Sequence, residues 1–152
     1  AMPQFKGVDR RFDFKLKNDH IVFLSDYAHH PAEIKQSVSS LRMLYPDKKL
    51  TAIFQPHLYT RTRDFYKDFA DSLSLLDEVI LLDIYPAREL PIEGVTSKLI
   101  YDNLRPGIEK TMCHKEDLIE LLKTKKIEVL ITLGAGDVDN YVTPIYELLK
   151  DR

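Results

Sequence analysis

The chain alternates between short apolar runs and longer stretches in which apolar residues recur every three or four positions. The short runs are typical of buried β-strands. They lie at 21–25, 50–54, 79–83 and 128–133, with a weaker run at 109–113. Ahead of them, residues 12–17 alternate between apolar and charged side chains. This alternation predicts an exposed strand that turns back, antiparallel, against the first buried strand.

The stretches between the runs have the periodicity of amphipathic helices. Their apolar positions are 34, 38, 41 and 45; 65, 69 and 73; 118, 121 and 122; and 141, 145 and 148. Pro31 falls in the first turn of the first helix, where its fixed φ suits helical geometry. Thr60 is a candidate N-cap residue for the second helix.

Strands that alternate with helices of this length predict an α/β fold. We expect a three-layer, Rossmann-like domain whose mostly parallel sheet has about five or six strands. A length of 152 residues with 44% hydrophobic composition fits one domain with its own core. We expect that domain to span residues 12–152, after a polar tether at 1–11.

Charge and cysteine content narrow the classes of function. Lysine and arginine total 22 against 24 acidic residues, without a basic block, so nucleic acid is not an expected partner. The single cysteine, Cys113, excludes an internal disulfide framework and fits the reducing cytoplasm. No apolar run approaches the roughly 20 residues of a membrane span, so membrane insertion is not expected. The phosphate-loop motif GxxxxGK[ST] is absent from these residues.

Four polar segments follow predicted strands: DYAHH, QPHLYTRTR, IYPAREL and GAGDVD. In an open α/β sheet, ligands bind at the carboxyl ends of the strands, so we expect these segments to share one edge. The candidate site residues are Asp26, Tyr27, His29, His30, His57, Arg61, Arg63, Gly134, Gly136 and Asp137.

Each candidate also fits a simpler role. His29 and His30 stand where the first amides of a helix need acceptors. Arg61 lies in a helical first turn, where the helix dipole disfavours a cation; this placement indicates an anionic partner such as a carboxylate or phosphate. A metal site built from His29, His57 and a carboxylate is another alternative, although no HxxxH spacing supports it. The GAGD segment either cradles an anion or only makes a tight turn.

The segments DYAHHPAEI, FQPHLYTRTRDFYKDFADSL, DIYPARE followed by GVTS, and LGAGDVD resemble the carboxy-terminal domain of the Mur ligases. They occur in the family's order and rough spacing, and the resemblance runs from about Phe5 to the end. It is strongest to the members that join L-alanine to UDP-N-acetylmuramate in peptidoglycan synthesis. In these ligases ATP and magnesium convert the sugar carboxylate into an acyl phosphate, which the alanine amine attacks.

The resemblance implies that two further domains precede residue 1, bind the UDP-sugar and carry the ATP phosphate loop. Residues 1–11 would then be the linker from the central domain, and Ala1 is interpreted as a residue left by an expression tag. ATP and Mg²⁺ are expected in the full-length enzyme, with neither held by this fragment alone. The fragment is therefore expected to be inactive by itself.

The resemblance also assigns roles. Tyr27 is expected near the adenine of ATP, with Asp26 beside the cofactor, and His29, His57 and Arg61 are expected at the reacting centre. The expected substrate-binding residues are His30, Arg63, Gly134, Gly136 and Asp137; no metal ligand is expected. Leu58 stands where many family members have arginine. The alternatives are a related ligase that recycles a whole tripeptide, and a free-standing binding module or metal hydrolase.

Overall fold

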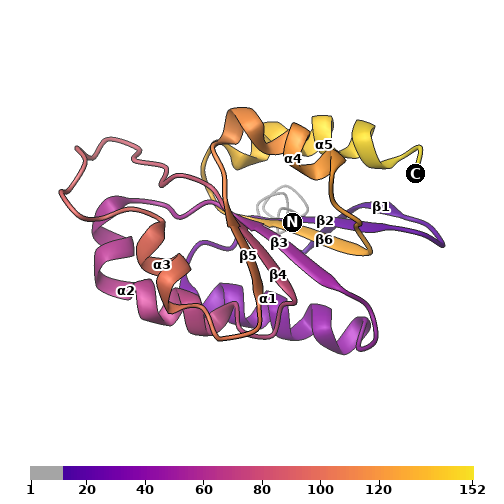
Figure 1. The fold of residues 1–152 in the computed structure, drawn as a ribbon, viewed down its shortest axis with the longest axis horizontal. Helices are drawn as coiled ribbons and strands as arrows, with labels where there is room; N and C mark the ends of the chain where they lie inside the picture. Colours follow the sequence, from indigo (N-terminus) through magenta and orange to yellow (C-terminus); the bar gives the residue numbers. More distant parts are fainter. Residues whose placement is uncertain (1–11) are drawn as a thin grey trace, which may run out of the picture.

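A six-stranded sheet forms the centre of the structure, a computed structural model that describes residues 12–152. The strands are β1 (Asp13–Lys17), β2 (Val22–Asp26), β3 (Leu50–Phe54), β4 (Glu78–Leu81), β5 (Glu109–Met112) and β6 (Val129–Leu133). Their order in the sheet is β1-β2-β6-β3-β4-β5 (Figure 1). Only β1 runs antiparallel to its neighbour. The predicted sheet is confirmed, including the antiparallel first strand; the predicted tether at 1–11 lies outside the described residues.

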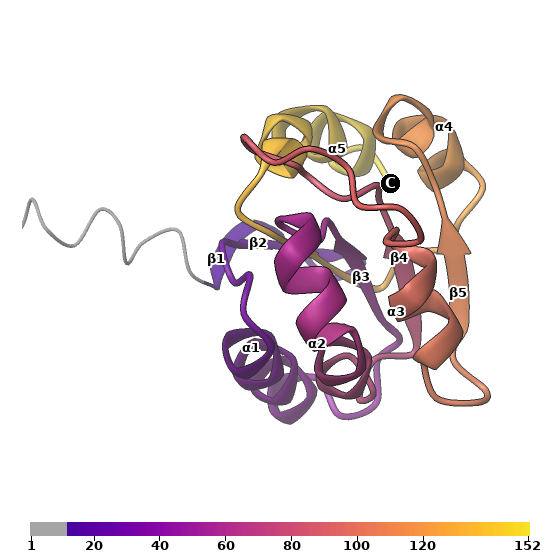
Figure 2. The ribbon, with the colours of Figure 1, turned by 90° about the vertical axis from the view of Figure 1, so that its left-hand side faces the viewer.

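Helices cover both faces of this sheet. Helices α1 (Pro31–Leu44), α2 (Tyr59–Ser72) and α3 (Lys98–Asn103) lie on one face, and α4 (Leu118–Lys123) and α5 (Val142–Leu149) lie on the other (Figures 1 and 2). Strands β2, β3 and β6 are buried along their whole length. Burial on both faces explains why these strands are uninterrupted apolar runs in the sequence. The three-layer α/β prediction is therefore confirmed. None of the helices in residues 12–152 is long and apolar enough to cross a membrane.

Helix α1 begins at Pro31, as its sequence predicts. The carboxylate of Glu33 accepts hydrogen bonds from the backbone N–H groups of His29 and His30, at 3.1 and 3.2 Å. A carboxylate at this position satisfies amides that have no partner within the helix and favours the positive end of the helix dipole. The turn that carries the two histidines is thereby fixed to the start of α1.

Helix α2 departs from the prediction at its start. It begins at Tyr59, with Leu58 as the N-cap residue, so the expectation that Thr60 caps it is wrong. Its first amides instead donate to Glu89, which lies 30 residues further along the chain. The chain bends out of helical geometry at Phe65, whose side chain is 44% exposed and not on the buried face.

The apolar pattern of the sequence does not predict helix α3. It is only six residues long, and Ile100 is the only residue in it that is fully buried. A helix of this length shows too little apolar periodicity to be recognised in a sequence.

The connections between strands and helices diverge at one edge of the sheet. Strands β2 and β3 lead into α1 and α2 on one face, whereas β6, which lies between them, leads towards α5 on the other. Loops that leave neighbouring strands in opposite directions open a space at the strands' carboxyl ends. The predicted site residues follow these three strands.

Candidate functional site

His29, His57 and Arg61 come together at the carboxyl edge of the sheet. The ring centroids of His29 and His57 are 5.7 Å apart, although one follows β2 and the other follows β3. A guanidinium nitrogen of Arg61, Nη1, lies 3.2 Å from Nδ1 of His57. The ring of His30 is 4.6 Å from that of His29. The predicted meeting of these segments at one edge is confirmed.

The backbone partner of His29 indicates which ring nitrogen carries the proton. Its Nδ1 lies 3.1 Å from the carbonyl oxygen of Tyr27. A carbonyl oxygen only accepts hydrogen bonds, so Nδ1 must carry the proton. In the neutral ring Nε2 is then unprotonated and can accept a hydrogen bond or a proton.

His57 has the opposite arrangement. Its Nδ1 faces the guanidinium of Arg61, which only donates hydrogen bonds. Nδ1 therefore carries the lone pair, and the proton of the neutral ring is on Nε2. The cluster thus pairs one imidazole that can accept at Nε2 with another that can donate there.

Burial and nearby positive charge favour the neutral forms of His57 and His30. Burial, followed by the Arg61 guanidinium and His29, lowers the pKa of His57 below its usual value. The same three causes, in the same order, lower the pKa of His30. Arginine does not lose its proton in proteins, so Arg61 remains a fixed cation beside His57. A bound carboxylate or phosphate group would find both a charge and hydrogen-bond donors here.

Tyr85, in the loop after β4, supports the cluster and was not among the predicted site residues. Its ring stacks on His57, with centroids 5.5 Å apart and planes 17° apart. The two residues also pair in a parallel β-bridge. Tyr85 belongs to the predicted segment IYPAREL, but the sequence gives no sign that its ring packs on a residue 28 positions earlier.

The loop after β6 lies against the same support. A Cβ atom added at Gly136 would come within 2.5 Å of the Tyr85 ring and 2.6 Å of the side-chain oxygen of Gln55. Gly134 has φ of +146°, a backbone conformation that residues with a side chain rarely adopt. A Cβ atom added there would lie 3.0 Å from the backbone oxygen of Gln55. These glycines allow the loop to approach Tyr85 and Gln55 closely.

Asp137 is engaged in bonds within the protein. Its carboxylate accepts hydrogen bonds from Gln55 and Lys115, and the oxygen of the Gln55 amide accepts the Val138 N–H at 2.9 Å. Burial would raise the pKa of Asp137, but the bonds from Lys115 and Gln55 outweigh it and lower that pKa. This geometry gives the GAGD segment the role of a tight turn, and substrate binding by Gly134, Gly136 and Asp137 stays a prediction.

Asp26 also has a clear structural role. Its carboxylate is 2% exposed and accepts hydrogen bonds from the Ala28 N–H, at 2.9 Å, and from the Ser37 hydroxyl. Tyr27 packs edge-to-face on His29 and, with Gly134, lines a cavity of about 120 Å³. Contacts of Asp26 and Tyr27 with a cofactor stay predictions.

The other predicted arginine lies outside the cluster. Arg63 is exposed and forms an ion pair with the neighbouring Asp64, with 2.9 Å between Nε and Oδ1. Arg61 and Arg63 thus differ in exposure and in their partners, a difference that the sequence alone does not show.

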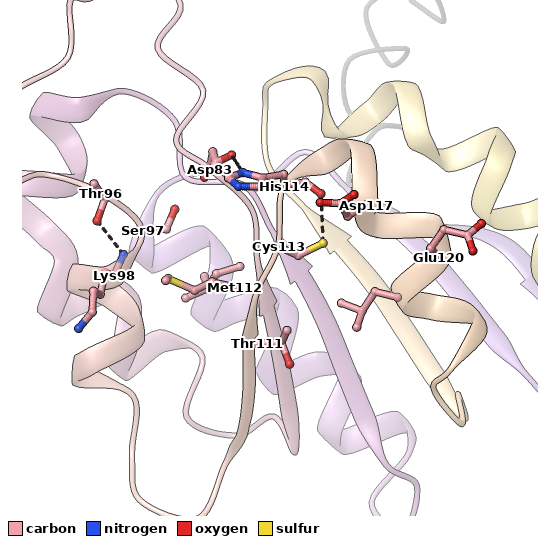
Figure 3. A pocket seen from close by; sticks show the side chains of 12 residues that line it. Asp83, Thr96, Ser97, Lys98, Thr111, Met112, Cys113, His114, Asp117 and Glu120 are labelled. Carbon is pink, nitrogen blue, oxygen red and sulfur yellow. Dashed lines mark hydrogen bonds and ion pairs between the residues drawn. The ribbon is translucent and has the colours of Figure 1, made fainter.

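Two further features bear on cofactors and ligands. No group of three His, Cys, Asp or Glu side chains within residues 12–152 is placed to hold a metal ion. A cavity of about 590 Å³ lies at the carboxyl ends of β4 and β5, between α3 and α4 (Figure 3). An exposed ion pair between Asp83 and His114, 2.6 Å long, forms part of its lining. None of the predicted site residues lines this cavity.

Similarity to known proteins agrees with the resemblance seen in the motifs. The chain is 77% identical over its full length to UDP-N-acetylmuramate–L-alanine ligase of Phocaeicola vulgatus, of which it covers 33%. It superposes with a TM-score of 0.74 on the crystal structure of UDP-N-acetylmuramate-alanine ligase from Thermotoga maritima, at 27% identity, covering 93% of this chain and 30% of that one. The chain thus spans about a third of the length of these relatives.

The same fold has also been solved as a separate domain. A domain from a proposed UDP-N-acetylmuramate:L-alanyl-γ-D-glutamyl-diaminopimelate ligase of Haemophilus ducreyi superposes with a TM-score of 0.67 at 18% identity. The match covers 91% of this chain and 99% of that one. At this identity the match shows the fold alone.

The family model described as "Mur ligase, glutamate ligase domain" matches residues 10–136. That span includes the histidine, arginine and tyrosine segments that meet at the carboxyl edge. The chain therefore belongs to the Mur ligase family.

Proposed function

We propose that this chain is the carboxy-terminal domain of an ATP-dependent ligase that joins L-alanine to UDP-N-acetylmuramate. The observation that carries the proposal is the meeting of His29, His57 and Arg61 at the carboxyl edge of the sheet. The 77% identity to an enzyme named for that reaction supports L-alanine over a tripeptide as the amino substrate. The proposal places the enzyme in the bacterial cytoplasm, where ATP and nucleotide sugars are available.

The three side chains have complementary roles in this reaction. Arg61 would hold the carboxylate of L-alanine through charge-assisted hydrogen bonds. The Nε2–H of His57 would donate to the oxygen that becomes negative when the amine attacks the activated carboxyl group. The unprotonated Nε2 of His29 would accept a proton from the attacking amine.

The rest of the enzyme would supply the nucleotide chemistry. The chain spans about a third of its relatives, and residues 12–152 contain no cluster that fits a metal ion. We therefore assign the binding of UDP-N-acetylmuramate, ATP and Mg²⁺ mainly to the preceding domains, with Tyr27 against the adenine. Magnesium, when bound there, would neutralise phosphate charge.

Amino-acid-dependent phosphate release tests the proposal. The full-length enzyme should release phosphate from ATP with UDP-N-acetylmuramate and L-alanine, but far more slowly with L-alanyl-γ-D-glutamyl-diaminopimelate. The 152-residue chain alone should show no turnover. Faster turnover with the tripeptide would show that the tripeptide, and not L-alanine, is the substrate. Substrate-dependent turnover by the isolated chain would contradict the assignment of ATP and UDP-N-acetylmuramate binding to the other domains.

A further inference from the structure

Glu89 joins the loop after β4 to the first turn of α2. Its Oε1 accepts the backbone N–H groups of Tyr59, at 2.5 Å, and Thr60, at 3.1 Å. Its Oε2 accepts the hydroxyl of Thr60. The first turn of α2 contains no acidic residue of its own. Glu89 therefore supplies both the acceptors and the negative charge that this helix N-terminus requires.

The same loop also holds the residues just before the helix. The Tyr85 N–H donates to the Pro56 carbonyl, and the Leu58 N–H donates to the Tyr85 carbonyl, both at 2.8 Å. Leu58 has φ of +75°, a conformation that residues other than glycine rarely adopt. Such a conformation persists only where surrounding contacts impose it. Here the contacts on either side of Leu58 come from one loop.

His57 and Arg61 lie on opposite sides of this held segment. Their contact at 3.2 Å depends on the direction in which α2 leaves the turn, because one residue precedes the helix and the other lies within its first turn. We propose that Glu89 is a positioning residue, which fixes the first turn of α2 so that Arg61 stays paired with Nδ1 of His57. The proposal deepens the proposed function, since the pair it positions is the one assigned to L-alanine.

A side-chain NMR measurement on the isolated chain tests the positioning without assuming any activity. Glu89→Ala should abolish the preference of His57 for the Nε2–H tautomer and raise its pKa, because the Arg61 guanidinium no longer faces the ring. Loss of the Glu89 charge alone works in the other direction, since that charge raises the pKa of His57. The sign of the change therefore separates lost positioning from lost charge.

Three further variants keep the test decisive. Glu89→Gln retains a side-chain oxygen that can accept hydrogen bonds from the two amides. His57 should therefore keep its Nε2–H tautomer, and its pKa should stay equal or fall. Glu93→Ala, at an exposed position in the same loop, should change neither quantity. An Nε2–H tautomer and an unchanged or lowered His57 pKa in a folded Glu89→Ala chain would overturn the proposal. If Glu89→Ala does not fold, Thr60→Val removes one of the three hydrogen bonds that Glu89 accepts and should partly shift the His57 tautomer. An unchanged tautomer in Thr60→Val would also overturn the proposal.

Kinetics of the full-length enzyme then separate this proposal from the proposed function. Glu89→Ala should raise KM for L-alanine about tenfold, the equivalent of one lost charge-assisted contact, with a smaller change in KM for ATP. Glu89→Gln should restore most of the loss. A changed tautomer with unchanged kinetics for L-alanine would support the positioning role and contradict the assignment of Arg61 to L-alanine.

Discussion

His29 and His57 face one another with ring centroids 5.7 Å apart, yet their Nδ1 atoms make opposite kinds of hydrogen bond. Nδ1 of His29 donates to the Tyr27 carbonyl, and Nδ1 of His57 accepts from Arg61. In their neutral forms the two imidazoles therefore present an acceptor and a donor at their Nε2 atoms. An amine that attacks an activated carboxyl group needs one of each.

His57 and His30 should make the unfolding free energy of the chain depend on pH. The pKa values of His57 and His30 are lowered, so the unfolded chain binds more protons than the folded chain over the range between the folded values and about 6.5. Their contribution to the unfolding free energy is present above pH 6.5 and is lost as pH falls through that range. NMR titration should show both rings protonating below pH 6.5, and Arg61→Gln should raise the pKa of His57.

His114 provides an internal comparison of opposite sign. The hydrogen bond and charge of Asp83 raise its pKa, so it should titrate above pH 6.5. Asp83→Asn should bring that value down and leave His57 unchanged. A His57 ring that titrates at or above the ordinary value would contradict the neutral cluster.

The turn after β2 depends on one buried carboxylate. Asp26→Ala would leave the Ala28 N–H and the Ser37 hydroxyl without this acceptor, so we expect a loss of about 2–3 kcal/mol in unfolding free energy. Ser37→Ala removes one bond and should cost about 1 kcal/mol. Asp19→Ala, at an exposed position, should stay within about 0.5 kcal/mol of the parent. Urea unfolding measures all three, and equal values for Asp26→Ala and Asp19→Ala would contradict the role of the carboxylate.

The sequence predicts most of the fold because the central strands are buried on both faces and therefore appear as continuous apolar runs. It also places His29, His57 and Arg61 at one edge, since parallel strands share the direction of their carboxyl ends. Contacts between distant segments leave no local pattern. Glu89 caps a helix that begins 30 residues earlier, which is why Thr60 is a plausible but incorrect cap. The sequence likewise does not show that Arg63 is exposed and paired with Asp64, because it does not reveal which side chains of a helix face the solvent.

Gly136 offers a steric test of the support behind His57. Its φ of −100° lies outside the left-handed region that favours glycine, and a new Cβ would meet the Tyr85 ring at 2.5 Å. The contact requires a shift of the loop, of Gln55 or of Tyr85. We expect Tyr85 to move and the NMR signals of the stacked His57 ring to shift with it.

Gly94→Ala is the matched comparison. Gly94 has φ of +79° and no neighbour within 4 Å of an added Cβ. This variant should lose about 1 kcal/mol through backbone strain while leaving the His57 signals in place. Identical His57 spectra for the two variants would show that Tyr85 does not hold the ring.

The last prediction concerns Arg61 in the full-length enzyme. Arg61→Ala should remove a charge-assisted bond worth about 1.5–3 kcal/mol, which lowers kcat/KM for L-alanine roughly ten- to 150-fold. Lysine should restore only part of this loss, because a point charge cannot reproduce the planar fork of a guanidinium. The neighbouring Leu58 offers no replacement cation.

Stability and substrate dependence distinguish the explanations of that loss. Kinetics with L-alanine and ATP varied separately show which substrate Arg61 contacts, and thermal unfolding shows whether the domain remains intact. Lys67→Ala is the matched control, since this exposed cation on the same helix is not a candidate site residue and should have a much smaller effect on kcat/KM. Wild-type kcat/KM for both substrates in Arg61→Ala would remove Arg61 from the site. A large fall in Tm would instead mean that the contact between Arg61 and His57 stabilises the fold. If Arg61 only binds the substrate carboxylate, its loss should lower the affinity for L-alanine and leave Tm almost unchanged.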